Sequence, residues 1–171
     1  MISTQQSYEL CPWLRIAHQY DGLRELTDAG ELNDTVRDFF RSTRFPRELV
    51  DKRTPWCAAF ACTCFELANV KHPRSARAKD FLDSPHFVKL RRPVRGAALV
   101  FERFVAGKLT EHAGHVTFCD RDPLSVHQVE VACFGGNQRN AACMERRKTE
   151  HLIATLWPKG WPLPPGAELA A

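Results

Sequence analysis

The alternation of apolar and polar residues divides this chain into a helical half and a half made of short strands. Apolar residues recur every three or four positions over residues 13–20 and again over 36–40, which is the spacing of amphipathic helices. Asn33, a favoured N-cap, precedes the second of these stripes. A further stripe predicts a short helix over residues 75–82. The first half of the chain is therefore expected to be helical.

The segment from Thr54 to Glu66 predicts the central helix, and its first turn carries a cysteine. Thr54 is a favoured N-cap, and Pro55 suits the first helical position because its missing N–H would be unpaired there. Cys57 then falls in the first turn, where free N–H groups and the positive end of the helix dipole favour a thiolate over a thiol. The dipole contributes at most about 2 kcal/mol. A nucleophilic Cys57 therefore needs a second cation nearby, which in cysteine hydrolases is a histidine. The alternative to a nucleophile is that Cys57 is a buried structural cysteine.

One face of this helix consists of small residues. They recur at i, i+4, i+7 and i+11 and comprise Cys57, Ala61, Cys64 and Ala68. Such a face allows the helix to lie close against a sheet. A histidine partner for Cys57 is therefore expected on that sheet.

The second half of the chain consists of short apolar runs bounded by turn residues. Four of these runs predict strands, at residues 97–101, 114–119, 126–134 and 151–157. The proline- and glycine-rich segment 159–171 is expected to be extended or disordered. Helices followed by an antiparallel sheet make an α+β plan. We expect a single domain over residues 1–171, with its core at about 11–158.

The composition is that of an ordinary globular domain. The 171 residues are 44% hydrophobic and 26% charged, and no apolar run approaches the length of a membrane span. Residues 1–7 lack the pattern of a secretory signal peptide, so we expect a product made in the cytoplasm, with no integral membrane segment. The net charge of +4 admits an anionic partner such as a cell-wall polymer. Seven cysteines form no C-x-x-C pair, and their odd number leaves at least one thiol unpaired in a monomer.

His115 is the candidate partner of Cys57. It follows Gly114 at the start of a predicted strand, where the small neighbour lets another group approach the imidazole. The next predicted strand ends in Gly135-Gly-Asn-Gln138, and a side-chain amide there can accept the ring N–H and fix the orientation of the imidazole. Asn137 is the first choice for that role and Gln138 the second. A plain glycine turn is the alternative.

Two other classes of function are weighed against a cysteine hydrolase. His112 and His115, together with Cys57 or Cys119, are zinc-ligand types. They lack the paired ligand spacings of zinc sites, so we expect neither a metal nor another cofactor. The basic residues are dispersed and not interleaved with aromatic residues, so we expect no nucleic-acid partner.

Six motifs, taken in order, resemble one known family. They are Pro12-Trp13, Asn33 at a helix start, Thr-Pro-Trp-Cys-Ala-Ala-Phe at 54–60, Ser-Ala-Arg-Ala at 75–78, Gly-His-Val at 114–116 and Gly-Gly-Asn-Gln at 135–138. The chain resembles, over residues 11–158, the NlpC-like and CHAP-like group of papain-fold peptidoglycan amidases and endopeptidases. This group includes small phage lysins and type VI secretion effectors.

The resemblance implies a papain-like fold and a role for each matching residue. Cys57 falls on the nucleophile, His115 on the base and Asn137 on the polar orienting residue. Trp56 and Gln138 are then expected to contact the substrate, although Trp56 can equally be a buried structural residue. The side chain that completes the oxyanion hole in papain-like enzymes has no identifiable match, which leaves the Cys57 backbone N–H as the expected donor.

The resemblance also implies the reaction, which is hydrolysis of an amide bond in the stem peptides of the bacterial cell wall. The expected setting is an antibacterial type VI secretion effector that acts as a monomer in the periplasm. Its partners would be the secretion apparatus and a cognate immunity protein. A phage endolysin with the same chemistry is an alternative, and so is an acyltransferase that uses the same Cys–His dyad.

Overall fold

The computed structural model describes residues 10–105, 108–122 and 129–170, with only the backbone described for 104, 105 and 108–113. The α-helices are α2 (Pro12–His18), α3 (Asp34–Phe39) and α4 (Cys57–Leu67). The 3₁₀ turns are η1 (Phe40–Ser42), η2 (Arg47–Leu49), η3 (Ala78–Phe81) and η4 (Thr149–His151). The strands are β1 (Phe87–Leu90), β2 (Ala98–Val105), β3 (Lys108–Cys119), β4 (Glu130–Gln138), β5 (Ala141–Lys148) and β6 (Leu152–Pro158).

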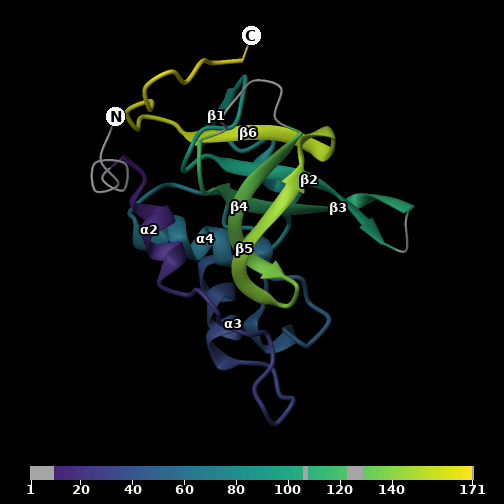
Figure 1. The fold of residues 1–171 in the computed structure, drawn as a ribbon. Coiled ribbons are helices and arrows are strands. Elements are labelled where there is room, and N and C mark those ends of the chain that lie inside the picture. Colours follow the sequence, from purple (N-terminus) through teal and green to yellow (C-terminus); the bar gives the residue numbers. More distant parts are fainter. Residues whose placement is uncertain (1–9, 106–107, 123–128, 171) are drawn as a thin grey trace.

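The strands form one sheet in the order β1-β6-β2-β3-β4-β5, and every neighbouring pair is antiparallel. In Figure 1, β2, β3 and β6 run nearly horizontally, whereas β4 and β5 curve steeply across them. The sheet is therefore strongly bent at the junction of β3 and β4. Separate helices and an antiparallel sheet confirm the α+β class.

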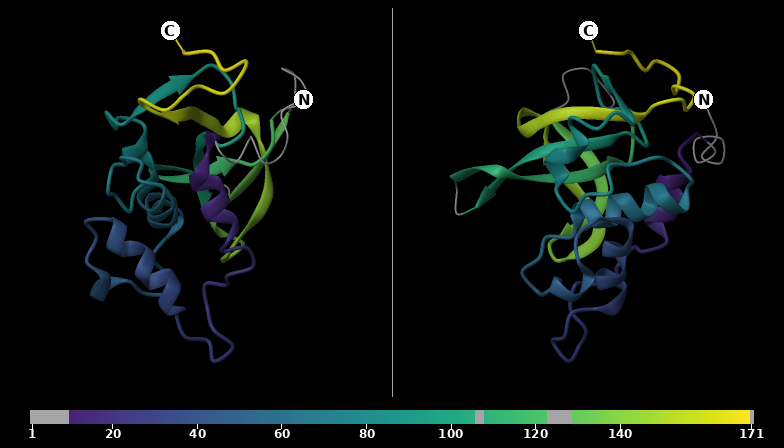
Figure 2. Two further views of the ribbon diagram at one scale, coloured as in Figure 1. Left: turned by 90° about the vertical axis from the view of Figure 1, so that its left-hand side faces the viewer. Right: turned by 180° about the vertical axis from the view of Figure 1, so that it is seen from behind.

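Helix α4 lies at the centre of the molecule. It packs against β3 and β4 on one side and against α2, α3 and η1 on the other. Figure 2 shows α4 nearly end-on in its left view, with α2 beside it and α3 below it. Eight of its eleven residues are buried, including Cys57, Ala61 and Cys64 of the predicted small-residue face. Burial on almost all sides makes α4 a core helix.

The start of α4 differs from the prediction. The helix begins at Cys57 and its N-cap is Trp56, so Thr54 is not the N-cap and Pro55 precedes the helix. The Thr54 hydroxyl instead donates to the Asp51 carboxylate (2.9 Å) and accepts from the Asp51 backbone N–H (3.1 Å), which closes a separate turn. The prediction that Cys57 lies in the first turn is confirmed, since Cys57 is the first helical residue.

Other elements agree with the sequence pattern in part. Asn33 caps α3 through its side chain, which accepts from the Thr35 N–H as predicted. The helix expected over residues 75–82 is shorter, because the Ser75 hydroxyl accepts from the Arg77 N–H and donates to Asp80, and only Ala78–Phe81 forms a 3₁₀ turn. All four predicted strands are present, although residues 126–128 of one lie outside the described residues.

Two strands were not predicted, β1 and β5. β1 is an edge strand with partly exposed side chains, and β5 carries four charged residues in succession at its end. Within residues 159–170, the Arg91 N–H donates to the Glu168 carbonyl (2.9 Å) and the Ala170 N–H to the Lys89 carbonyl (2.9 Å), so this segment runs beside β1. Among the described helices, none has the length and apolar character needed to cross a membrane.

Candidate active site

The candidate site lies where β3 and β4 separate. The two strands are in register only at Phe118↔Phe134 and Cys119↔Cys133, and β4 is irregular between Gly135 and Gln138. The first residues of α4 occupy the space that opens there. An added Cβ on Gly136 would lie 2.5 Å from Trp56 Cζ3 and 2.7 Å from Phe60 Cβ, so the backbone of β4 passes directly over the start of the helix.

This arrangement brings Cys57 beside the segment of β3 that carries His115. The Val116 backbone N–H lies close enough to the Cys57 sulfur to lower the pKa of its thiol, and Val116 follows His115 directly on β3. Val116 also pairs with Val100 of β2, so this part of β3 is held in the sheet. The structure therefore places the predicted nucleophile against the backbone that carries the predicted base.

Burial determines the charge state of the thiol. Cys57 is only 2% exposed, and desolvation raises its pKa above the ordinary value. The N–H groups of Val116 and Ala58 and the charges of Arg103 and Arg147 all lower it, but they do not outweigh desolvation. The expected effect of the helix start is present, since the Ala58 N–H lowers the pKa of the thiol, but desolvation outweighs it and the sulfur at rest is a thiol.

The imidazole of His115 is also neutral at rest. The ring is 6% exposed, and burial, followed by the charges of Arg147 and Arg103, lowers its pKa from 6.5 to about 3. The Gln138 side chain acts in the opposite direction and raises this pKa. His115 Nε2 is buried with no hydrogen-bond partner among the described residues. An unpaired ring nitrogen on a neutral imidazole is suited to take up a proton.

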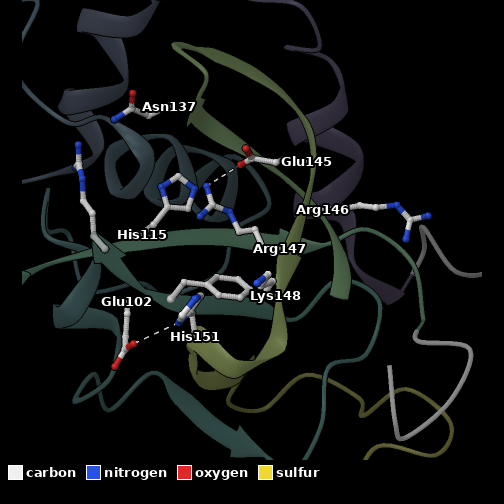
Figure 3. A pocket seen from close by; sticks show the side chains of 10 residues that line it. Glu102, His115, Asn137, Glu145, Arg146, Arg147, Lys148 and His151 are labelled. Carbon is white, nitrogen blue, oxygen red and sulfur yellow. Dashed lines mark hydrogen bonds and ion pairs between the residues drawn. The ribbon is translucent and has the colours of Figure 1, made fainter. Parts of the chain in front are cut away.

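Of the two candidate amides, Gln138 acts on His115. Its Nε2 donates to the Cys143 carbonyl (2.5 Å), and its Oε1 accepts from Arg147 Nε (3.4 Å). The side chain is 1% exposed, which suits positioning of the imidazole better than contact with a substrate. Asn137 has a left-handed backbone (φ 56°) and lines the adjoining pocket. In Figure 3 its side chain lies away from the His115 ring.

The irregularity of β4 explains this choice. If the ladder from Phe118↔Phe134 continued without a bulge, Asn137 would stand opposite His115. The β3–β4 ladder instead ends at Phe118↔Phe134. The pairing of β4 with β5 continues, but its register shifts between Gly135 and Gln138, which places a bulge in β4, and Gln138 pairs with Ala141. A bulge moves a side chain to the other face. Sequence reasoning cannot locate such a shift in a run of two glycines.

A pocket of about 400 Å³ opens in front of His115 (Figure 3). Its walls come from β2, β3, β4, β5 and η4 and comprise Phe101, Glu102, Arg103, His115, Asn137, Glu145, Arg146, Arg147, Lys148 and His151. Four Arg or Lys residues face two Glu residues, so the lining is basic. Cys57 is not among these residues, and His115 is the member of the pair that faces the pocket.

Arg147 is held firmly in this wall. Its guanidinium lies over the Phe101 ring, 5.6 Å from the ring centroid, and its Nη2 donates to Glu145 Oε2 (2.8 Å). On the opposite side of the pocket, His151 Nδ1 lies 3.7 Å from Glu102 Oε2. Sequence reasoning missed Arg103 and Arg147. The one signal for Arg147 is its i, i+2 spacing from Glu145, which puts both on one face of a strand once β5 is known.

Trp56, expected at the substrate, does not line this pocket. It is 0% exposed, stacks on Phe39 with ring centroids 5.9 Å apart, and donates from Nε1 to Glu25 Oε2 (3.2 Å). These contacts describe a structural tryptophan, which was the alternative interpretation. Its role is to hold the start of α4.

No group of three or more His, Cys, Asp or Glu side chains that could hold a metal ion occurs among the described residues. The His112 side chain, one of the weighed zinc ligands, lies outside that description. Comparisons with protein-family models, with curated proteins and with solved structures found no match to this chain.

Proposed function

We propose that this chain is a cysteine hydrolase with a papain-like arrangement, in which Cys57 is the nucleophile and His115 the base. The observation that carries the proposal is the approach of the Cys57 sulfur, at the first residue of the central helix, to the Val116 N–H that follows His115 on the adjacent strand. Thiol, imidazole and side-chain amide then come from α4, β3 and β4, three elements that meet at one point. The motif resemblance points to the same nucleophile and base, Cys57 and His115, and to Asn137, the residue next to Gln138, as the amide.

The neutral resting pair determines how the reaction would start. The Cys57 thiol passes its proton to His115 as the sulfur attacks the amide carbonyl, and His115 then gives that proton to the departing amine. Water hydrolyses the thioester with His115 as base. The Gln138 side chain favours the imidazolium in these steps, whereas Arg147 and Arg103 oppose it and favour the developing anion. Substrate binding has to uncover the sulfur, because Cys57 is buried.

The proposed substrate is an amide in the stem peptides of bacterial cell wall. Its support is the resemblance, together with a basic pocket that admits a polyanionic polymer with free carboxylates. The proposed setting is an antibacterial effector, which rests on the resemblance alone. Targeting the chain to the periplasm of a bacterial host tests this setting. The proposal is supported if the host lyses, if Cys57→Ala abolishes the lysis, and if co-expression of one neighbouring gene, which would encode the immunity protein, blocks it.

The chemistry is tested by incubating purified wall fragments with the protein and analysing the products by liquid chromatography and mass spectrometry. Cleavage adds the mass of one water across the new termini, whereas acyl transfer adds the mass of the acceptor. We expect Cys57→Ala to abolish cleavage and Cys62→Ala, a matched change in the same helix, to preserve it. Cleavage that survives Cys57→Ala, in protein that keeps its wild-type circular dichroism, would refute the assignment.

A further inference from the structure

Two cysteines that the candidate site does not use lie opposite each other in the sheet. Cys119 on β3 and Cys133 on β4 are register partners, so their side chains project from the same face of the sheet. Both are fully buried, and both thiols are free in this structure. The two thiols are close enough that Cys133 raises the pKa of Cys119, after the larger effect of burial.

The backbone hydrogen bonds show which kind of pair this is. The Cys119 N–H donates to the Ala97 carbonyl (2.8 Å), and the Cys119 carbonyl accepts from the Gly96 N–H (2.8 Å). Both main-chain groups of Cys119 are therefore directed away from β4, and the bond between the two strands is made by the next residue, from the Asp120 N–H to the Ala132 carbonyl (2.8 Å). Cys119 and Cys133 are thus a non-hydrogen-bonded pair.

This type of pair has the spacing that a disulfide requires. Directly opposed residues of a non-hydrogen-bonded pair have Cα atoms about 4.5 Å apart, and disulfides join Cα atoms roughly 4.4 to 6.8 Å apart. Four of the other five cysteines are placed less well. Cys57, Cys62 and Cys64 share one helix, where these separations do not bring side chains together, and Cys143 has Gly135 as its register partner.

We propose that Cys119 and Cys133 form a cross-strand disulfide when the chain folds under oxidising conditions. The bond would close the narrow seam between β3 and β4, which has only two register pairs. Beyond that seam the strands diverge toward His115 on β3 and Gln138 on β4. The proposal rests on strand register and stands whether or not the chain is a hydrolase.

The oxidation is a thiol–disulfide exchange with a disulfide oxidant such as oxidised glutathione. One cysteine thiolate attacks the oxidant and forms a mixed disulfide while one glutathione thiolate leaves. The second cysteine thiolate then displaces the other glutathione. The protein loses two electrons and two thiol protons, and the two glutathione thiolates take up these protons to become two thiols. Because both sulfurs are buried in the folded protein, the exchange takes place during folding or when the seam opens locally.

The test is to refold the reduced, denatured chain in a mixture of reduced and oxidised glutathione, block free thiols by alkylation, and map the peptides without reduction. Trypsin cuts after Arg121, between the two cysteines, so a disulfide joins two otherwise separate peptides. We expect the linked pair of peptides, an intact mass lower by two hydrogens, and a melting temperature higher than that of the reduced protein by roughly 5 to 10 °C.

Matched variants separate this bond from other effects of oxidation. Cys133→Ala should lose both the linked peptides and the redox-dependent rise in melting temperature, whereas Cys143→Ala, on the neighbouring strand, should keep both. Alkylation of Cys119 and Cys133 in correctly refolded oxidised protein, or their linkage to other cysteines, would overturn the proposal. If Cys133→Ala does not fold, the peptide map of the unmodified sequence still decides the question.

Discussion

Gly136→Ala tests the geometry on which the candidate site depends. The added Cβ would lie 2.5 Å from Trp56 Cζ3, 2.7 Å from Trp56 Cε3 and 2.7 Å from Phe60 Cβ. The two neighbours cannot move aside easily. The Trp56 indole is buried, stacked on Phe39 and hydrogen-bonded to Glu25, and Phe60 Cβ is attached directly to the α4 backbone.

The size of the effect follows from these distances. An ordinary contact begins at 3.4 Å, so β4 or the start of α4 must shift by 0.9 Å, which is 3.4 minus 2.5 Å. Forcing one additional carbon into a packed core costs about 1–3 kcal/mol. For a chain of this size each kcal/mol lowers the melting temperature by roughly 2–4 °C. We therefore expect a decrease of roughly 2–12 °C.

Gly114→Ala is the matched control, because the same substitution there meets less resistance. Its Cβ would lie 3.3 Å from Lys79 Cγ, which belongs to a flexible side chain, and 3.4 Å from Ala78 Cβ. Guanidinium unfolding followed by circular dichroism gives the free energies of unfolding of both variants and the wild type. The reasoning fails if Gly136→Ala unfolds within about 0.5 kcal/mol of wild type, or if Gly114→Ala is the more destabilised of the two.

A double-mutant cycle identifies the indole as the obstacle. Trp56→Phe removes part of the ring system that the new Cβ would meet, so Gly136→Ala should cost less in that background than in the wild type. Residues in direct contact couple by about 0.5–3 kcal/mol. Strictly additive losses would show that the strain at position 136 has another source.

Three further predictions concern His115, the amides of β4 and the C-terminal segment. Burial lowers the pKa of His115 from 6.5 to about 3. Between these pH values His115 binds a proton in the unfolded chain but not in the folded chain, so the free energy of unfolding falls as the pH falls. His115→Gln should therefore reduce the loss of unfolding free energy between pH 6.5 and pH 4 by up to roughly 3 kcal/mol, measured by urea titration at each pH. Gln138→Ala should lower kcat on wall fragments by on the order of 10-fold or more, because Gln138 is the amide that acts on His115. Asn137→Ala should lower kcat by less. Equal losses in the two variants would contradict the assignment of Gln138. Glu168→Ala should change the free energy of unfolding by less than about 0.5 kcal/mol, because both partners of its 3.4 Å ion pair with Arg91 are exposed. The main-chain hydrogen bonds between the C-terminal segment and β1 remain in this variant. A larger loss in thermal unfolding would show that side chains hold the C-terminal segment to β1.

Local patterns were sufficient for part of the fold. The N-cap at Asn33, the helical first turn at Cys57 and the four apolar runs that became strands depend on neighbouring residues alone. The predictions that Thr54 caps the central helix and that Ser75 begins a helix were wrong. Each hydroxyl can bond to nearby backbone groups or to a nearby carboxylate, and the sequence does not indicate which partner it takes. β5 was not predicted because its run of charged residues has low strand propensity, which pairing with β4 overrides.

What the sequence determined by itself is the set of chemical groups and their local conformations: a cysteine at the start of a helix, a histidine on a strand, and two amides at the end of the next strand. The tertiary structure decided how these groups meet. A bulge in β4 selected Gln138 over Asn137, because a shift of one residue in register exchanges the two faces of a strand. Burial in the folded protein made Cys57 and His115 neutral, because desolvation depends on what covers a group and not on its neighbours along the chain.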